Sequence, residues 1–327
     1  MSADAHPQRT SAYKPAVAWF AALGSAWVFV LVALGAFTTS IGAGMAFLDW
    51  PLSNGSLNPS GWLTEIDKFA EHSHRLSASV MSAITVILAV WLWRTEQRAW
   101  LRKLALFAVA LVLTQAVVGG LRVLLEGRHV EMVNTSVGRL FAMLHACLAQ
   151  LFACTLIAIA VSLSRGWIIR PLRVSCAVRR AGALCCVLLF CQLAIAAIMR
   201  HSFAGLAIPT FPASTPGGGL LPVAWDFRVG IHFAHRCMAA VLTVALIWFA
   251  FKIWFDRGAS LGMRCGASVL VSLLGFQILL GAWIIWSHRA AAMTTGHVLV
   301  GAATLVTTFW LTWLAHRDVV EETPAAP

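Results

Sequence analysis

Four histidines lie inside long apolar segments of the chain, where an imidazole is costly unless it is paired or bound to a metal. They are His74, His145, His235 and His297. The dipeptide His74-Arg75 recurs 161 positions later as His235-Arg236, and the other two histidines occupy a second pair of apolar segments. One such residue would be ordinary. Four in a repeated pattern predict two sites, each holding a porphyrin iron between two imidazoles.

Haem iron in a helical bundle takes one axial imidazole from each of two facing helices, which predicts the pairs His74–His145 and His235–His297. The plain alternative is four buried histidines bonded to backbone, Ser or Thr groups. This alternative could explain any one of the histidines, but it explains four histidines at matching positions less well. Zinc is a weaker reading, because no cysteine or carboxylate cluster completes a tetrahedral shell.

Glu71 makes the two predicted sites unequal. It lies three residues before His74, on the same helix face and one turn outward. A carboxylate beside an apolar pocket has a raised proton affinity, which suits general acid/base work. Its counterpart in the repeat is His232. We therefore expect one site to carry electrons and the other to transform its ligand; the alternative is that Glu71 only orients a neighbour.

Arg75 and Arg236 follow two of the ligand candidates, about 100° round the helix. We expect them to bind haem propionates, and the alternative is snorkelling to lipid headgroups. The remaining histidines that concern the sites are expected to be polar edge residues or partners of the ligands. They are His72, His129, His201, His232 and His288.

The composition indicates an all-α integral membrane protein. The chain is 60% hydrophobic and 11% charged, with a mean hydropathy of +0.80, outside the range of soluble domains. A membrane helix needs about 20 apolar residues, and eight stretches qualify. They are 17–40, 70–93, 104–122, 140–163, 181–199, 229–251, 266–286 and 293–315.

The net charge of +11 follows membrane topology rather than nucleic-acid binding. The segments 94–103, 164–180 and 252–264, with both tails, hold 15 of the 24 Lys and Arg residues. The positive-inside rule then places both termini in the cytoplasm. In a bacterial inner membrane, the four histidines would lie towards the periplasmic side, near the starts of the second, fourth, sixth and eighth helices.

The two halves of the chain align at the same offset of 161 residues. Residues 43–51 fall on 204–212, and Gln115 with Gly119 matches Gln277 with Gly281 after a small adjustment. This predicts tandem four-helix bundles related by a pseudo-twofold axis along the membrane normal. The expected parts are a tail (1–16), a first bundle (17–163), a basic linker (164–180), a second bundle (181–316) and a tail (317–327), the last ten residues frayed.

The order of these motifs resembles the haem A synthase family over residues 17–316. The segment 44–51 also looks like that family's first outer loop. The resemblance implies oxidation of the C8 methyl of haem O to a formyl group, giving haem A for terminal oxidases. It implies haem b at His235 and His297, haem O at His74 and His145, and a part for Glu71 in the chemistry.

The resemblance also implies partners: haem O synthase (protohaem farnesyltransferase), oxidase assembly factors, and a quinone or other redox partner. One departure is plain. Many bacterial members carry cysteine pairs in outer loops, whereas 41–68 and 200–228 contain no cysteine. The chain is thus similar to the cysteine-free branch, and mechanisms that use loop thiols do not apply. Rival readings are a dihaem electron-transfer protein, which would not need Glu71, and a transporter built from parallel repeats.

Overall fold

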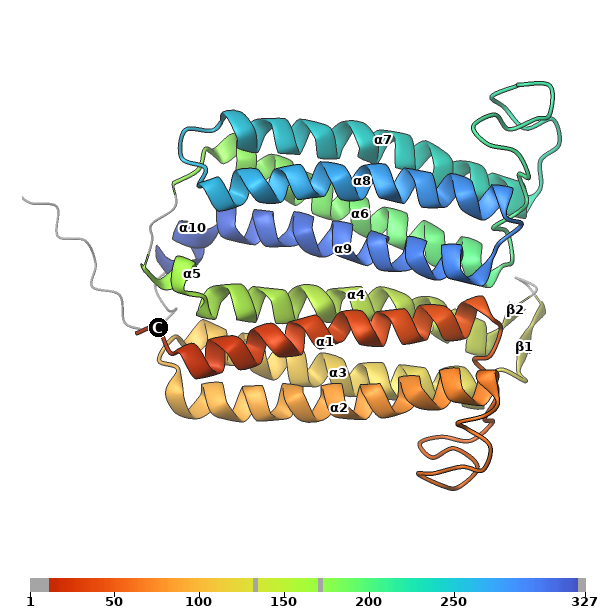
Figure 1. The fold of residues 1–327 in the computed structure, drawn as a ribbon, viewed down its shortest axis with the longest axis horizontal. Helices are drawn as coiled ribbons and strands as arrows, with labels where there is room; N and C mark the ends of the chain where they lie inside the picture. Colours follow the sequence, from red (N-terminus) through yellow and green to blue (C-terminus); the bar gives the residue numbers. More distant parts are fainter. Residues whose placement is uncertain (1–11, 132–134, 170–172, 323–327) are drawn as a thin grey trace, which may run out of the picture.

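Eight long helices run side by side in the computed structural model, which describes residues 12–131, 135–169 and 173–322 (Figure 1). Arg170 of the predicted linker, and the tail segments 1–11 and 323–327, lie outside the described residues. The long helices are α1 (Pro15–Ser40), α2 (Ile66–Thr95), α3 (Ala99–Leu124), α4 (Val137–Leu163), α6 (Cys176–His201), α7 (Phe227–Phe255), α8 (Leu261–Trp286) and α9 (Ala291–Ala315). Each has 25 to 30 residues. At about 1.5 Å per residue, each can cross a hydrocarbon core of about 30 Å.

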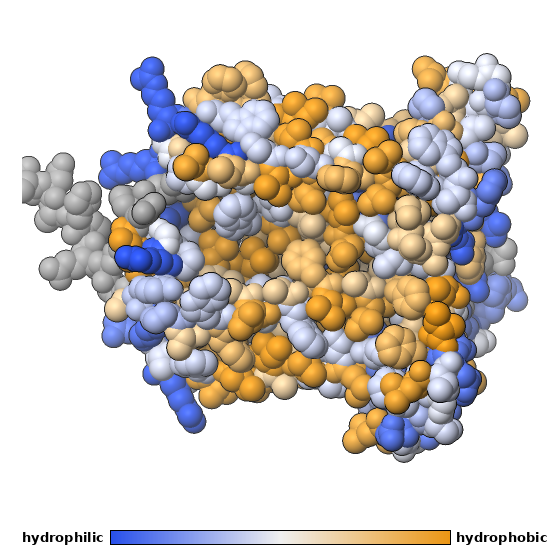
Figure 2. All heavy atoms as spheres, in the orientation of Figure 1, coloured by the Kyte–Doolittle hydropathy of each residue, from blue (hydrophilic) through white to orange (hydrophobic). Residues whose placement is uncertain are grey.

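The surface of the molecule is apolar where a membrane would surround it. Figure 2 shows a belt of apolar side chains across the middle of the visible face, with hydrophilic residues gathered at both ends. Large apolar side chains point outwards from the helices, such as Val244 (71% exposed) and Phe276 (60% exposed). In water such a surface would aggregate. The chain is therefore an all-α, multi-pass membrane protein, as the sequence predicts.

The helices form two groups of four. In the first group α1 contacts α2 and α4, and α3 contacts α2 and α4; α6 to α9 are connected in the same way. Each group buries its own apolar core, around Met81 and Leu92 in the first and Phe249 and Leu270 in the second. Helices α1 and α4 contact α9, and α4 also contacts α6. The pseudo-twofold axis and the domain boundaries stay predictions of the sequence.

The two ends of the molecule differ. We call one the loop end: it carries the connections 41–65, 125–136, 202–226 and 287–290, at the right of Figure 1. Its second connection contains a hairpin of two short strands, β1 (His129–Val130) and β2 (Thr135–Ser136). Helices α2, α4, α7 and α9 begin at this end. Three of the long helices begin after a capping serine, whose hydroxyl accepts a hydrogen bond from a backbone N–H of the first turn. These serines are Ser136, Ser175 and Ser260.

The opposite end carries two short helices that the sequence does not predict, α5 (Arg165–Ile169) and α10 (Arg317–Glu322). Arg317 is 3% exposed and donates from Nε to the carbonyl of Trp167 (2.6 Å). The Trp167 indole donates to Glu321 (2.6 Å). The expectation of a frayed tail is therefore wrong for the residues up to 322, because they form α10 and Glu321 accepts from the buried Trp167.

Arg98 connects this end to the first bundle, and we expect its removal to be costly. Its guanidinium binds both carboxylate oxygens of Glu96 (3.0 Å each) and Oε1 of Glu321 (3.0 Å). Its side chain is 5% exposed and that of Glu96 is 3% exposed. Breaking a buried pair from one side costs about 3–5 kcal/mol. Arg98→Ala should lower the stability against thermal unfolding in detergent by that amount, whereas the exposed Arg94→Ala should change it little; equal losses would contradict this.

Candidate bis-histidine sites

The four predicted ligands lie at matching places near the loop end. His74, His145 and His235 are each the ninth residue of their helix, and His297 is the seventh of α9. At about 1.5 Å per residue, they lie about 9–12 Å along their helices. The helices begin before the apolar stretches that the sequence shows, because polar residues such as Asp67 join the first turn of α2. The histidines therefore lie in the second and third turns, slightly deeper than the sequence predicts.

The second bundle brings the rings of His235 and His297 close together. Their ring centroids are 6.5 Å apart, with planes inclined at 58°. A metal–imidazole bond is about 2 Å long. Two such bonds on opposite sides of one ion, together with the distance from each ring centre to its nitrogen, account for this separation of the centroids. Both Nδ1 atoms are buried without a hydrogen-bond partner. Buried polar atoms normally have partners, so these side chains fit an axially ligated haem.

In the first bundle, His74 and His145 are buried in the same way as the second pair. Their Nδ1 atoms are likewise buried without a partner. The structure gives a ring contact for the second pair and matching helix positions for His74 and His145; the assignment of either pair to a haem stays a prediction. No group of three or more His, Cys, Asp or Glu side chains in the described part of the chain could hold a metal.

Glycines on neighbouring helices make room for three of the rings. A Cβ atom added at Gly35 of α1 would lie 2.9 Å from Cε1 of His74, and one at Gly119 of α3 would lie 3.1 Å from Cε1 of His145. In the second half, Gly281 of α8 would approach His297 to 3.3 Å. The amide of Gln277, one turn before Gly281, contacts Nε2 of His297 (3.2 Å). The repeat at Gly119 and Gly281 therefore marks ring contacts, whereas nothing in the sequence pattern singles out Gly35.

The Gly35 contact gives a prediction about haem content. Gly35→Ala should displace the His74 ring, because the added methyl would lie closer than carbon atoms normally approach. The haem bound by the first half should fall, as measured by absorption after haem supplementation. Gly275→Ala in α8 is the matched control, since nothing lies within 4 Å of its added Cβ. That variant should keep its haem and gain about 0.5–1 kcal/mol of stability; equal haem loss in both would contradict the prediction.

Glu71 is 5% exposed and fully engaged. Its Oε2 accepts from the backbone amides of Ala46 (2.7 Å) and Phe47 (3.2 Å), and Oε1 accepts from Arg75 (2.5 Å). These contacts show the orienting role that the sequence leaves open. An acid/base role for the same carboxylate, one turn from His74, stays a prediction.

The two motif arginines donate mainly to backbone carbonyls of the loops at 41–65 and 202–226. Their predicted contact with haem propionates is not tested by these bonds and stays a prediction. The two sets of bonds correspond to each other residue by residue.

Four of the other histidines divide into two kinds, and His201, the last residue of α6, is half-buried. His129 and His288 are exposed, as edge residues should be. His72 (3% exposed) and His232 (4% exposed) are buried, and His72 contacts the Ser53 hydroxyl (3.0 Å) and the Leu57 carbonyl (3.2 Å). Both therefore hold loop segments rather than face solvent.

Asp49 helps to shape the same loop. The backbone amides of Gly55 and Asn54 donate to its two carboxylate oxygens (2.8 Å each). The hydrogen bond from Gly55 contributes most to holding the pKa of Asp49 below its ordinary value. The carboxylate thus fixes a turn at 53–56, where Asn54 and Gly55 both have positive φ.

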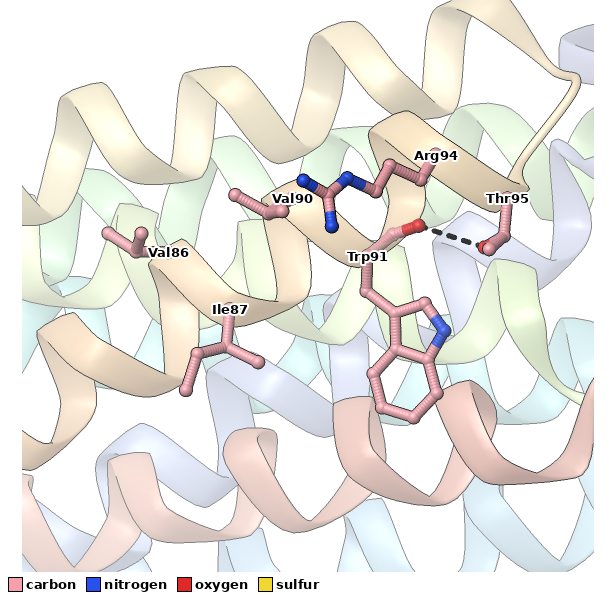
Figure 3. Close-up of a pocket in the computed structure, with 6 residues that line it drawn as sticks. All are labelled: Val86, Ile87, Val90, Trp91, Arg94 and Thr95. Atoms are coloured by element: carbon pink, nitrogen blue, oxygen red, sulfur yellow. Dashed lines mark hydrogen bonds between the residues drawn. The ribbon is translucent and has the colours of Figure 1, made fainter.

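One hollow of about 350 Å³ lies elsewhere, on the outer face of α2 near the opposite end (Figure 3). Val86, Ile87, Val90 and Trp91 supply most of its wall. It contains no histidine or carboxylate, so it offers none of the groups that the predicted chemistry needs. Its exposed valines and isoleucine suit contact with lipid chains.

Comparison with known proteins agrees with the resemblance seen in the sequence. The profile of the COX15-CtaA family, described as cytochrome oxidase assembly protein, matches residues 18–309. A heme A synthase from Erythrobacter litoralis is 26% identical over 86% of this chain and 92% of its own length. One from Rhodospirillum centenum is 25% identical over 99% of this chain and 94% of its own. One from Halalkalibacterium halodurans is 27% identical over 70% and 74%.

Proposed function

This chain belongs to the COX15-CtaA family of cytochrome oxidase assembly proteins, and we propose that it is an oxidoreductase that makes haem A. Its substrate would be haem O, whose C8 methyl becomes a formyl group. The names of the relatives support haem A synthesis. The observation that carries the proposal is a buried histidine pair in each bundle, whose Nδ1 atoms have no hydrogen-bond partner, with a carboxylate one turn from His74 only.

We assign the two histidine pairs to different porphyrins. His235 and His297 would hold a resident haem b, which supplies a one-electron carrier when bound. His74 and His145 would hold the substrate. The asymmetry between Glu71 and His232 supports this order, because a carboxylate can take up a proton beside the reacting methyl whereas the second site needs no such group.

The reaction requires electrons and protons to leave the first site. Conversion of a methyl to a formyl group adds one oxygen atom; with water as its source, R–CH3 + H2O gives R–CHO + 4 H⁺ + 4 e⁻, so an acceptor such as a quinone or a partner protein must take four electrons. Glu71 would accept a proton close to the reacting carbon, and its contacts with Arg75 and with the amides of Ala46 and Phe47 hold its side chain in place. The surrounding apolar helices would exclude water from the porphyrin ring.

The membrane setting follows from the same proposal. Haem O carries a farnesyl tail, which would lie in the lipid, so the substrate would arrive laterally from the bilayer, supplied by a haem O synthase. The loop end would face the periplasm and both termini the cytoplasm, as the positive-inside rule predicts.

Expression together with a source of haem O tests the function. Extracted haems separated by chromatography should include haem A, and they should lack it when His74→Ala replaces the wild-type chain. A protein that carries two haems, leaves haem O unchanged and still exchanges electrons would instead be a dihaem electron-transfer protein.

A further inference from the structure

Arg75 holds the loop that follows α1. Its guanidinium donates to the backbone carbonyls of Phe47 (3.2 Å), Asp49 (2.8 Å) and Leu52 (2.5 Å). A planar group with five N–H donors can bind several carbonyls at once, which an ammonium group does less well. One side chain of α2 therefore fixes six consecutive residues of backbone.

Arg236 holds the loop that follows α6 in the same way. It donates to the carbonyls of Ile208 (3.1 Å), Thr210 (2.7 Å) and Ala213 (3.3 Å). Each of these acceptors lies 161 residues after its counterpart in the first loop. The two halves therefore share the same set of three arginine–carbonyl hydrogen bonds, which chance contacts would not produce at three equivalent positions.

The residue four positions before each arginine completes the contact. Glu71 accepts from the amide of Phe47 (3.2 Å) and binds Arg75, while the counterpart His232 lies 3.2 Å from both the amide of Ile208 and Nε of Arg236. We call each arginine with this residue a clasp. The first clasp is Glu71–Arg75 and the second is His232–Arg236.

The two clasps differ in strength for a chemical reason. A carboxylate has acceptor capacity for all the donors that surround Glu71. Both ring nitrogens of His232 face N–H donors, yet a neutral imidazole has one acceptor nitrogen and one donor nitrogen. Only one of the two contacts can be a hydrogen bond at any moment. The second clasp therefore lacks one bond and also lacks the charge of an ion pair.

Each clasped loop closes the loop end of its bundle. Phe47 is fully buried and Ile208 is 2% exposed, and the alanines that begin the two segments, Ala43 and Ala204, are 5% and 0% exposed. Glu71 lies three residues, and thus about one helical turn, before His74. The clasped segments 43–52 and 204–213 therefore lie just above the two histidine pairs.

We propose that Arg75 and Arg236 are positioning residues that clasp these segments as straps over the two sites, and that residue 71 or 232 sets how firmly each strap is held. The strap of the first half is the firmer one. This role belongs to the chain itself and does not depend on which porphyrin each half binds. It also gives the arginines a task other than the propionate contact that the sequence predicts.

Single cysteines at the buried first residues of the straps test the proposal. Ala43→Cys and Ala204→Cys place a thiol at matching buried positions, and the parent protein corrects for its eight native cysteines. In the purified full-length protein, labelling by a polar maleimide should be slow at both sites. Arg75→Gln should accelerate labelling at 43 and not at 204, and Arg236→Gln should do the reverse. Hydrogen bonds to charged groups contribute about 1.5–3 kcal/mol, so each acceleration should be about tenfold or more.

Exchanging the clasp residues tests the ranking. His232→Glu should slow labelling at 204 below the rate of the parent clasp, and Glu71→His should raise labelling at 43 to about the rate seen at 204. Glu71→His also separates this proposal from the function: the strap should remain partly held, while haem A formation stops. Loss of haem A with little change in labelling speaks against the clasp and leaves the catalytic proposal intact.

Arg75→Lys distinguishes a strap role from a propionate role, and it serves if the glutamine variant fails to fold. Lysine keeps the charge for a propionate, but its compact ammonium group binds three separate carbonyls less well than the planar guanidinium does. The strap proposal expects fast labelling at 43 with an unchanged haem absorption spectrum. The proposal would be overturned if labelling at 43 stayed slow in both Arg75→Gln and Arg75→Lys while haem was lost only from Arg75→Gln. It would also be overturned if Arg75→Gln or Arg236→Gln accelerated labelling at 43 and 204 equally.

Discussion

Replacement of His235 by alanine is expected to remove the haem of the second half and to end haem A formation. In the proposed site these two imidazoles hold one iron; their ring centroids are 6.5 Å apart, and neither Nδ1 has a hydrogen-bond partner. A single remaining ligand would leave the porphyrin without its second axial bond. The measurement is the reduced-minus-oxidised spectrum of the purified protein, in which the haem b band should fall to the level contributed by the first half.

Two further variants sharpen this test. His288→Ala removes an exposed histidine at the same loop end and should leave the spectrum unchanged. His235→Gly leaves a space of imidazole size, so added imidazole should restore part of the haem band. An unchanged spectrum in His235→Ala, with full haem content, would remove both residues of this pair from the ligand assignment.

Glu71→Gln is the second change with a large expected effect. The glutamine carbonyl can still accept from the amides of Ala46 and Phe47, but it cannot take up a proton. General acid/base groups contribute about 10²–10⁴-fold to rate, so haem A formation should fall at least about 100-fold while bound haem stays near normal. Chromatography of extracted haems measures the first quantity, and the absorption spectrum measures the second.

The structure explains the choice of glutamine over alanine. Either substitution removes the oxygen that accepts from Arg75, but alanine would also release two backbone amides that glutamine still binds, so loss of activity in the alanine variant would not separate chemistry from loop position. Glu65→Gln is the matched control and should keep its activity. Glu65 lies at the start of the same helix, half of its side chain is exposed, and among the described residues its ion pair is with Lys68. Retained activity in Glu71→Gln would exclude the carboxylate from the chemistry.

Features that depend on long apolar runs could be predicted from the sequence. The eight membrane helices follow from hydropathy because each run must cross the same thickness of lipid. The histidine pairs follow from the repeat, since matching positions on matching helices reach the same depth. Gly119 and Gly281 follow from the same alignment, although their contact with the imidazoles is visible only in the structure.

Other features could not be predicted, for reasons that are physical. Gly35 has no glycine counterpart, because Ala196 stands 161 residues later. The clasps bind backbone carbonyls, which every residue carries, so no side-chain pattern reveals them. Helices α5 and α10 have five and six residues, too short for periodicity, and they are held by individual buried partners such as Arg317 and Trp167.

The docking of α10 has a consequence for how the two halves find each other. Glu321, beyond the last long helix, binds Arg98 in the turn between α2 and α3. The final residues of the second half thus recognise the first half through charges at the membrane boundary, where lipid cannot compete for them. If the chain were cut at 170–172 and produced as two polypeptides, reassembly would depend on this charged contact, and a fragment ending at 315 would associate more weakly than one ending at 322.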